Sequence, residues 1–122
     1  MAKMGIADLI GSAQILANSG QGALAAELYR DWAALNPDDA LLHAVHFNRG
    51  VLLADAGDLR GAVEAFTAAI ARRPDFLPPY INLGAACERL GAKVQAYGHW
   101  AHVSASLGGV SGETVTYKAT AL

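Results

Sequence analysis

Cysteine is almost absent from this sequence: Cys87 is the one cysteine in 122 residues. A lone cysteine has no partner within its own chain, so no internal disulfide can staple the fold, and nothing implies an oxidising compartment. We therefore expect a protein of the reducing cytoplasm. We also expect Cys87 to pack as a small hydrophobic residue rather than to act as a nucleophile.

Long apolar runs are missing as well. Charged or polar residues and glycines interrupt every apolar stretch before it reaches the roughly 18 residues of a membrane span. Asp8 breaks the short apolar stretch near the N-terminus, where a signal peptide would need an uninterrupted apolar core. We expect a protein that is neither secreted nor inserted in a membrane.

Charge of either sign is scarce, with 9 Lys and Arg against 11 Asp and Glu. The net charge of −2 provides no basic field for a polyanion, so nucleic acid is not an expected partner. Alanine is abundant instead, with 26 residues, and its high helix propensity favours an all-α fold. The length fits one domain that covers residues 1–122.

Several residues recur along the chain at one interval. Pairs separated by 34 residues are Gly50 and Gly84, Gly57 and Gly91, Ala62 and Ala96, Phe66 and Trp100, and His46 and Tyr80. An upstream copy lies 37 residues earlier, in Gly20 and Gly57, Ala25 and Ala62, Tyr29 and Phe66, and Pro37 and Pro74. Internal repeats of this length indicate stacked helical pairs.

Small residues in the repeat predict close packing within each pair. Gly50 and Gly84 fall inside the first helix of a pair, where a Cβ would hold the second helix away. Ala62 and Ala96 are the small residues expected to face them. We expect the larger aromatic residues to fill the space between neighbouring pairs, and these are Tyr29, Phe66 and Trp100.

Other repeated residues predict where helices begin and end. Glycine accepts the left-handed conformation that ends a helix, which is the role expected of Gly20, Gly57 and Gly91. Asp58 can cap the following helix, and proline closes the second helices at Pro37 and Pro74. The predicted helices are 5–18, 22–35, 40–55, 59–72, 76–90 and 93–107.

These residues resemble the tetratricopeptide repeat, which combines a large residue, Leu-Gly, Ala-x3-Phe and a closing Pro. The best copies read Tyr80-x2-Leu83-Gly84-x2-Cys87 with Ala96-x3-Trp100, and His46-x2-Arg49-Gly50-x2-Leu53 with Ala62-x3-Phe66 and Pro74. The resemblance implies a right-handed α–α superhelix of three helix-turn-helix repeats, near 6–39, 43–76 and 77–109. A partial helix over 111–122 would cap the stack or continue into a longer chain.

The resemblance also implies a concave groove lined by the first helix of each pair, where Asn48 and Asn82 occupy equivalent positions. A carboxamide offers both a donor and an acceptor, so it can pair with the main chain of a bound peptide. Alternatively, each asparagine orders the adjacent turn without a ligand. Helical spacing places six further residues on the same surface: Phe47, Val51, Ile81 and Ala85, with Asp55 and Arg89 towards the helix ends.

Phe47 and Ile81 have a second interpretation, since either can contact a neighbouring repeat or another copy of the chain. Two histidine pairs with three-residue spacing, His43 with His46 and His99 with His102, have no cysteine or acidic cluster nearby to complete a metal site. We expect no metal, no cofactor and no catalytic residue.

The expected function is a non-catalytic scaffold that binds a peptide segment of a partner protein. Two alternatives remain open. The segments 47–53 and 80–86 are similar to the repeat region of bacterial SPINDLY-like relatives of O-linked N-acetylglucosamine transferase, which implies a substrate-recognition region of a larger glycosyltransferase. The third possibility is a homo-oligomer that assembles through the apolar faces at the ends of the stack.

Overall fold

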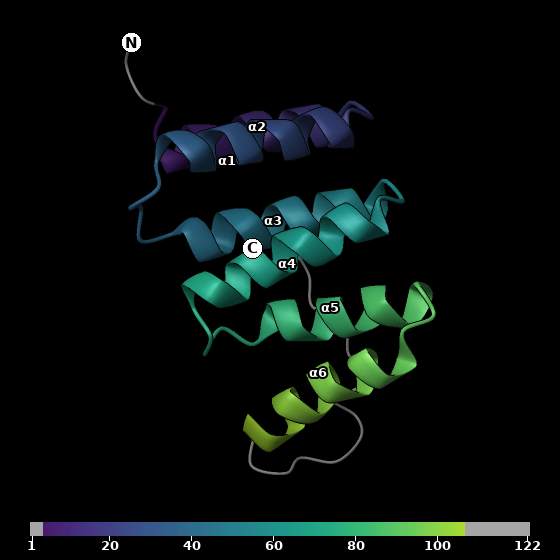
Figure 1. The fold of residues 1–122 in the computed structure, drawn as a ribbon. Helices are drawn as coiled ribbons and strands as arrows, with labels where there is room; N and C mark the ends of the chain where they lie inside the picture. The colour runs from purple at the N-terminus through teal and green to yellow at the C-terminus, as the bar shows by residue number, and fades with distance from the viewer. Residues whose placement is uncertain (1–3, 107–122) are drawn as a thin grey trace.

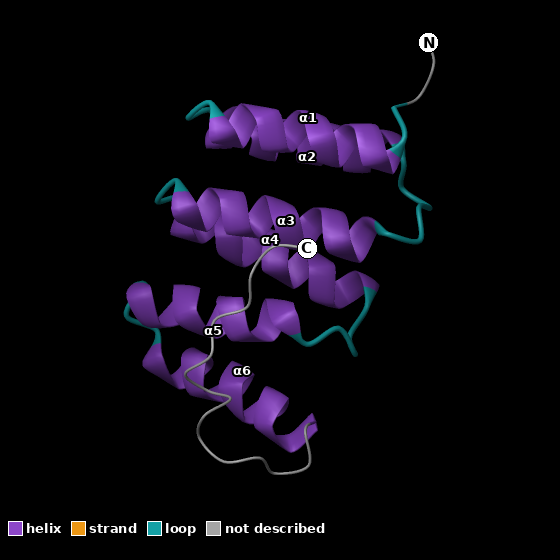
Figure 2. Cartoon of the chain, turned by 180° about the vertical axis from the view of Figure 1, so that it is seen from behind, coloured by secondary structure: helices purple, strands orange, loops and turns teal. Residues whose placement is uncertain are grey.

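The computed structural model describes residues 4–106, which form six helices and no strand within that range. These helices are α1 (Ile6–Asn18), α2 (Gly22–Leu35), α3 (Leu42–Asp55), α4 (Leu59–Arg72), α5 (Pro78–Arg89) and α6 (Lys93–Ser106). Figures 1 and 2 show them stacked as successive antiparallel pairs. The all-helical prediction is confirmed, while the partial helix predicted over 111–122 lies outside the described residues.

The helix ends follow the repeated glycines and prolines. Gly20, Gly57 and Gly91 adopt φ values of +79°, +88° and +85° in the turns after α1, α3 and α5. A side chain there would be strained, so these residues end the first helix of each pair as predicted. At the start of α4, the N–H of Gly61 donates to Asp58 Oδ1 at 2.9 Å, which confirms the predicted cap.

Two helices begin two residues later than predicted. Before α3, the N–H of Leu41 donates to Asp39 Oδ1 at 2.8 Å, and this bond holds a turn where the prediction started the helix. In α5, Pro78 and Pro79 occupy the first turn, where the missing N–H groups of proline cost no intrahelical hydrogen bond. Local side-chain chemistry therefore sets both starts.

Each of the last two pairs packs an aromatic ring of its second helix against a glycine of its first helix. A Cβ placed on Gly50 would lie 2.5 Å from Cε1 of Phe66, and one placed on Gly84 would collide with the indole of Trp100. The glycines are thus needed for close approach, as predicted. Ala62 and Ala96, expected to face these glycines, are buried on α4 and α6, and the nearest atoms to each added Cβ are those of the rings.

Two hydrophobic clusters form the core, and α3 contributes to both. The first contains Leu9, Ala13, Ala25, Tyr29, Trp32, Leu42 and Val45, and the second contains Phe47, Ala62, Phe66, Ala69, Ile81, Leu83, Cys87, Ala96 and Val103. Burial raises the pKa of the Cys87 thiol, as expected for a packed cysteine. No helix within residues 4–106 has the length and apolar character needed to cross a bilayer.

The contact between Gly50 and Phe66 generates the first prediction. Gly50→Ala should lower the free energy of unfolding by about 1 to 3 kcal/mol, because the new methyl group forces the buried ring of Phe66 to move. Gly11→Ala is the matched control, since a Cβ at this helical glycine meets nothing within 4 Å. It should stabilise the protein by about 0.5 to 1 kcal/mol through helix propensity.

Urea unfolding followed by circular dichroism measures both changes. Equal effects of the two substitutions would show that ring packing against Gly50 does not limit the stability of the fold.

Candidate functional site

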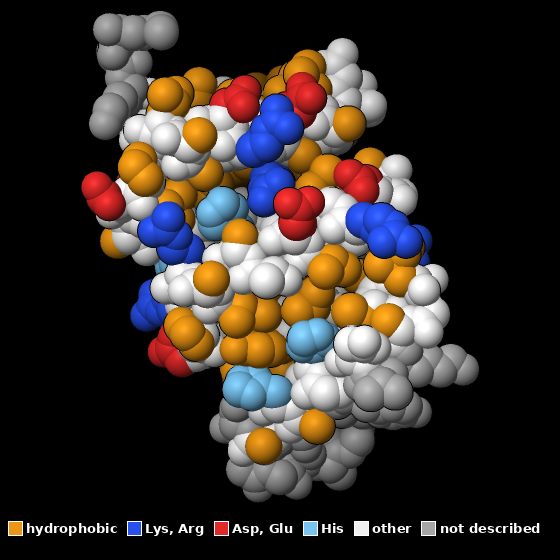
Figure 3. Space-filling model, in the orientation of Figure 1, with side chains coloured by type: hydrophobic (Ala, Val, Ile, Leu, Met, Phe, Trp, Pro, Cys, Tyr) orange, Lys and Arg blue, Asp and Glu red, His pale blue; other side chains and the backbone are white. Residues whose placement is uncertain are grey.

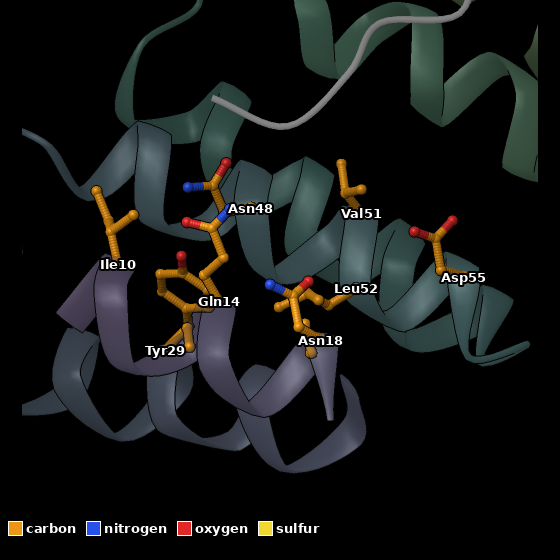
Figure 4. Close-up of a pocket in the computed structure, with 10 residues that line it drawn as sticks. Ile10, Gln14, Asn18, Tyr29, Asn48, Val51, Leu52 and Asp55 are labelled. Carbon is orange, nitrogen blue, oxygen red and sulfur yellow. The ribbon is translucent and has the colours of Figure 1, made fainter. Parts of the chain in front are cut away.

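A groove of about 310 Å³ lies between α1 and α3, and we call it the α1–α3 groove. Figure 4 shows its lining, which combines residues from two successive helix pairs. The apolar lining consists of Ile10, Ala13, Ala17, Val51 and Leu52, and the polar lining consists of Gln14, Asn18, Tyr29, Asn48 and Asp55. The groove therefore offers both apolar contact and hydrogen-bonding groups.

Tyr29 and Asn48 form a buried polar pair in this lining. Their residues are 4% and 5% exposed, and the two side chains are hydrogen-bonded to each other. Burial raises the pKa of the Tyr29 hydroxyl, and the hydrogen bond with Asn48 partly opposes that rise. The phenol thus stays neutral at physiological pH, and Asn48 has an internal partner that links α3 to α2.

The rim of the groove is accessible. Gln14 and Asn18 on α1 and Asp55 on α3 are exposed. Among the described lining residues, Asp55 alone carries a charge, and Figure 4 places it at the opposite end of the groove from Ile10. A ligand therefore meets two exposed carboxamides along one wall and a carboxylate at one end.

The structure brings together three of the eight residues predicted to form the peptide groove. Asn48, Val51 and Asp55 all line the α1–α3 groove. The other five do not line it, and four of them lie on α5: Ile81, Asn82, Ala85 and Arg89. Of these, Ala85 is half-buried and Arg89 is exposed.

Phe47 and Ile81 belong to the core, so their prediction as groove residues is corrected. Phe47 is 0% exposed and Ile81 is 9% exposed. The ring of Phe47 lies 5.8 Å from that of Phe66 and 5.7 Å from that of Phe76, measured between centroids. Phe76 stands in the connection before α5 and covers Phe47. Phe47 therefore fits its second interpretation, in which it contacts the neighbouring repeat.

Asn82 occupies the same place on α5 that Asn48 occupies on α3. It is 5% exposed, and its Oδ1 atom is buried without a hydrogen-bond partner in the described part of the chain. An unpaired buried carbonyl costs free energy, so this atom is the acceptor that a donor from outside the helices would satisfy.

The predicted groove residues include three of the ten lining residues and omit the other seven, among them the polar side chains of Gln14, Asn18 and Tyr29. The signal was available in the 37-residue interval, because Gln14 precedes Val51 by 37 positions and Asn18 precedes Asp55 by the same number. Transferring the groove positions of the second repeat onto the first repeat, 37 residues earlier, would have found both. Tyr29 could not be found this way, because its aromatic position was assigned to packing.

A second polar cluster lies where α2, α3 and α4 meet. His46 and Arg49 on α3 are half-buried, and His46 Nδ1 and Arg49 Nε have no hydrogen-bond partner within residues 4–106. Burial, followed by the positive charges of Arg49 and Arg72, lowers the pKa of His46 to about 4. The imidazole is therefore neutral at physiological pH.

Two of the other histidines, His43 and His102, make aromatic contacts. His43 is buried edge-on to Phe76 at 4.9 Å, and His102 stacks on Tyr80 at 4.2 Å. The described residues contain no group of three or more His, Cys, Asp or Glu side chains that could hold a metal ion. Packing accounts for His43 and His102 without a ligand.

Comparison with known proteins assigns no family. No protein-family model matches the chain, and no curated protein matches it either. The functional inference therefore rests on the geometry and chemistry of the α1–α3 groove.

The buried pair in the groove gives a second prediction. Tyr29→Phe should lower the free energy of unfolding by about 1 kcal/mol, since it removes a hydrogen bond from the buried Asn48 carboxamide. Tyr80→Phe is the matched control, because the Tyr80 hydroxyl donates to the Pro74 carbonyl oxygen at 3.0 Å in an exposed setting. Its effect should be less than half as large when both are measured by urea unfolding. A larger effect for Tyr80→Phe would contradict the assignment.

His46 generates a pH prediction. Its pKa is about 4 in the fold and about 6.5 in an unfolded chain, so the unfolded chain binds more protons between these values. The free energy of unfolding should therefore fall as the pH decreases from 6.5 to 4. His46→Gln should show a shallower fall in urea titrations across this range. His99, whose pKa is also lowered, contributes equally to both proteins, so identical slopes would contradict a buried neutral His46.

Proposed function

We propose that the chain is a non-catalytic protein-interaction scaffold, built from tetratricopeptide-like helix pairs, that binds a peptide segment of a partner protein in the α1–α3 groove. The observation that carries this proposal is a groove shared by two successive pairs, with an apolar lining and exposed carboxamides on its rim. The lone buried Cys87 supports a reducing compartment such as the cytoplasm.

The geometry of the pairs supports the tetratricopeptide-like part of the proposal. Left-handed glycines recur after α1, α3 and α5 at the intervals of the sequence repeat. The glycine–aromatic contact recurs in the second and third pairs, at Gly50 with Phe66 and at Gly84 with Trp100. The glycine turn thus occurs in three pairs and the ring contact in two, which favours one repeated structural unit. In the family that the sequence resembles, such units stack into a right-handed superhelix.

The chemistry of the groove favours a peptide ligand. Gln14 and Asn18 each offer a donor and an acceptor, which match the N–H and C=O groups of a peptide main chain. Ile10, Val51 and Leu52 provide the apolar surface against which side chains of a bound segment would pack. Main-chain pairing supplies affinity, and the apolar lining supplies selectivity.

The same lining favours binding over catalysis. The described residues that line the groove include no serine, cysteine, histidine or lysine. Tyr29 is hydrogen-bonded to Asn48, and Asp55 is exposed to solvent, so neither has the environment of an activated catalytic group.

Panning a phage library of random dodecapeptides against the purified chain tests the proposal. The affinity of a selected peptide is then measured by isothermal titration calorimetry for the parent chain and for the double variant Gln14→Ala with Asn18→Ala. Binding should weaken about tenfold, because two exposed hydrogen-bonding groups are lost without a change in the core.

Gln95→Ala is the matched control, since Gln95 is an exposed glutamine on α6 and is not among the groove residues. It should leave the affinity unchanged. If no peptide is enriched, or if the double variant binds as tightly as the parent chain, the groove is not the peptide site.

A further inference from the structure

His46 and Arg49 stand where the next repeat has packing residues. The residues 34 positions later are Tyr80, which stacks on His102, and Leu83, which is 4% exposed in the core. The second repeat therefore places an imidazole and a guanidinium in positions where the third repeat has an aromatic ring and an aliphatic side chain. Half-burying these groups has a desolvation cost that packing alone does not require.

Further cations approach this cluster from the adjacent helices. Arg72, in the last turn of α4, donates from Nη1 to the Pro37 carbonyl oxygen at 2.9 Å, so one side of its guanidinium is anchored beside the turn that precedes α3. Arg30 on α2 acts electrostatically on Arg49. Figure 3 shows blue and pale-blue side chains on this face of the upper part of the stack, with red side chains among them. Arg49 and Arg72 thus act on His46, and Arg30 acts on Arg49, so positive charges from three helices influence one another here.

The acidic side chains nearby do not neutralise the cluster. Glu64 on α4 is the carboxylate whose charge acts on Arg49, and Asp31 pairs with Arg30 at 3.6 Å, with both side chains largely exposed. No carboxylate of residues 4–106 comes within 4.0 Å of Arg49 or Arg72. The buried His46 Nδ1 and Arg49 Nε atoms have no hydrogen-bond partner in that range.

We propose that Arg30, Arg49, Arg72 and His46 form a binding site for a phosphate group, either free or carried as a monoester on another molecule. Guanidinium groups match phosphate oxygens in geometry and keep their charge in a partly buried setting. Guanidinium groups that come from three helices can contact several oxygens of a tetrahedral phosphate, whereas a planar carboxylate offers only two oxygens in one plane. A dianion also offsets the excess positive charge.

The phosphate site and the α1–α3 groove use different sides of α3. Asn48, Val51 and Asp55 fall on one side of the helix, and His46 and Arg49 are rotated away from them at 100° per residue. The phosphate site therefore does not depend on peptide binding in the groove, and the two proposals can fail independently.

Nuclear magnetic resonance of the full chain tests the proposal with inorganic phosphate as the first probe and an acetylated phosphoserine amide as the second. The imidazole signals of His46, assigned by comparison with His46→Gln, are followed at pH 7 against sodium chloride of equal ionic strength. A saturable shift is expected. Tighter binding of inorganic phosphate would identify free phosphate as the source, and tighter binding of the phosphoserine probe would identify a monoester.

Arg49→Gln and Arg72→Gln should each weaken phosphate binding about tenfold, because each removes a charge-assisted hydrogen bond. Arg60→Gln is the matched control: Arg60 is exposed on the same helix as Arg72 and takes no part in the cluster, so this variant should bind like the parent chain. Arg49→Lys keeps the positive charge and serves as the conservative variant. The helical circular dichroism signal of every variant is recorded, so that lost binding can be distinguished from lost folding.

A second readout uses sulfate, which stays dianionic between pH 3 and 8. Its presence should raise the midpoint of the His46 titration above about 4, because a bound dianion favours the imidazolium. The site is overturned by a shift that rises linearly without saturation, by an equal loss of binding in Arg60→Gln, or by the same His46 midpoint in sulfate and chloride.

Discussion

The approach of the Phe66 ring to the bare Cα of Gly50 is the contact on which the rest of this structure depends. It sets the distance between α3 and α4, and the same device with Trp100 and Gly84 sets the distance between α5 and α6. At those distances, Phe47 on the buried face of α3 packs against the rings of Phe66 and Phe76. Other positions of α3 line the α1–α3 groove, and Asp55 and Val51 are among them.

Helix ends were the part of the fold that sequence reasoning predicted best, because they depend on local backbone chemistry. A left-handed glycine, a capping aspartate and a proline act within a few residues, so Gly57, Asp58 and Pro74 could be interpreted without knowledge of the tertiary structure. Helices α3 and α5 begin two residues later than predicted for equally local reasons. Asp39 holds a turn before α3, and two prolines form the first turn of α5.

The candidate site was predicted less well, because membership of a groove depends on which neighbour covers a side chain. Phe47 has the right helical phase for the groove, yet Phe76, from a connection with no regular pattern, buries it. Ile10 stands 37 positions before Phe47 and does line the α1–α3 groove, since it is only half-buried. Equivalent positions in a repeat thus share a direction but not an environment, and periodicity alone predicts only the direction.

The division of the core into two clusters has a consequence for how the molecule behaves when stressed. Helix α3 contributes to both clusters, and it carries the polar side chains of His46, Asn48 and Arg49 among its apolar residues. Separately packed regions of a protein unfold locally as cooperative units of different stability. One wall of the α1–α3 groove comes from α1, which packs only in the first cluster, while α3 supplies the other wall. A molecule that fills the groove would contact both walls. Its binding would therefore hold α1 against α3 and raise the free energy needed to separate the two packed regions.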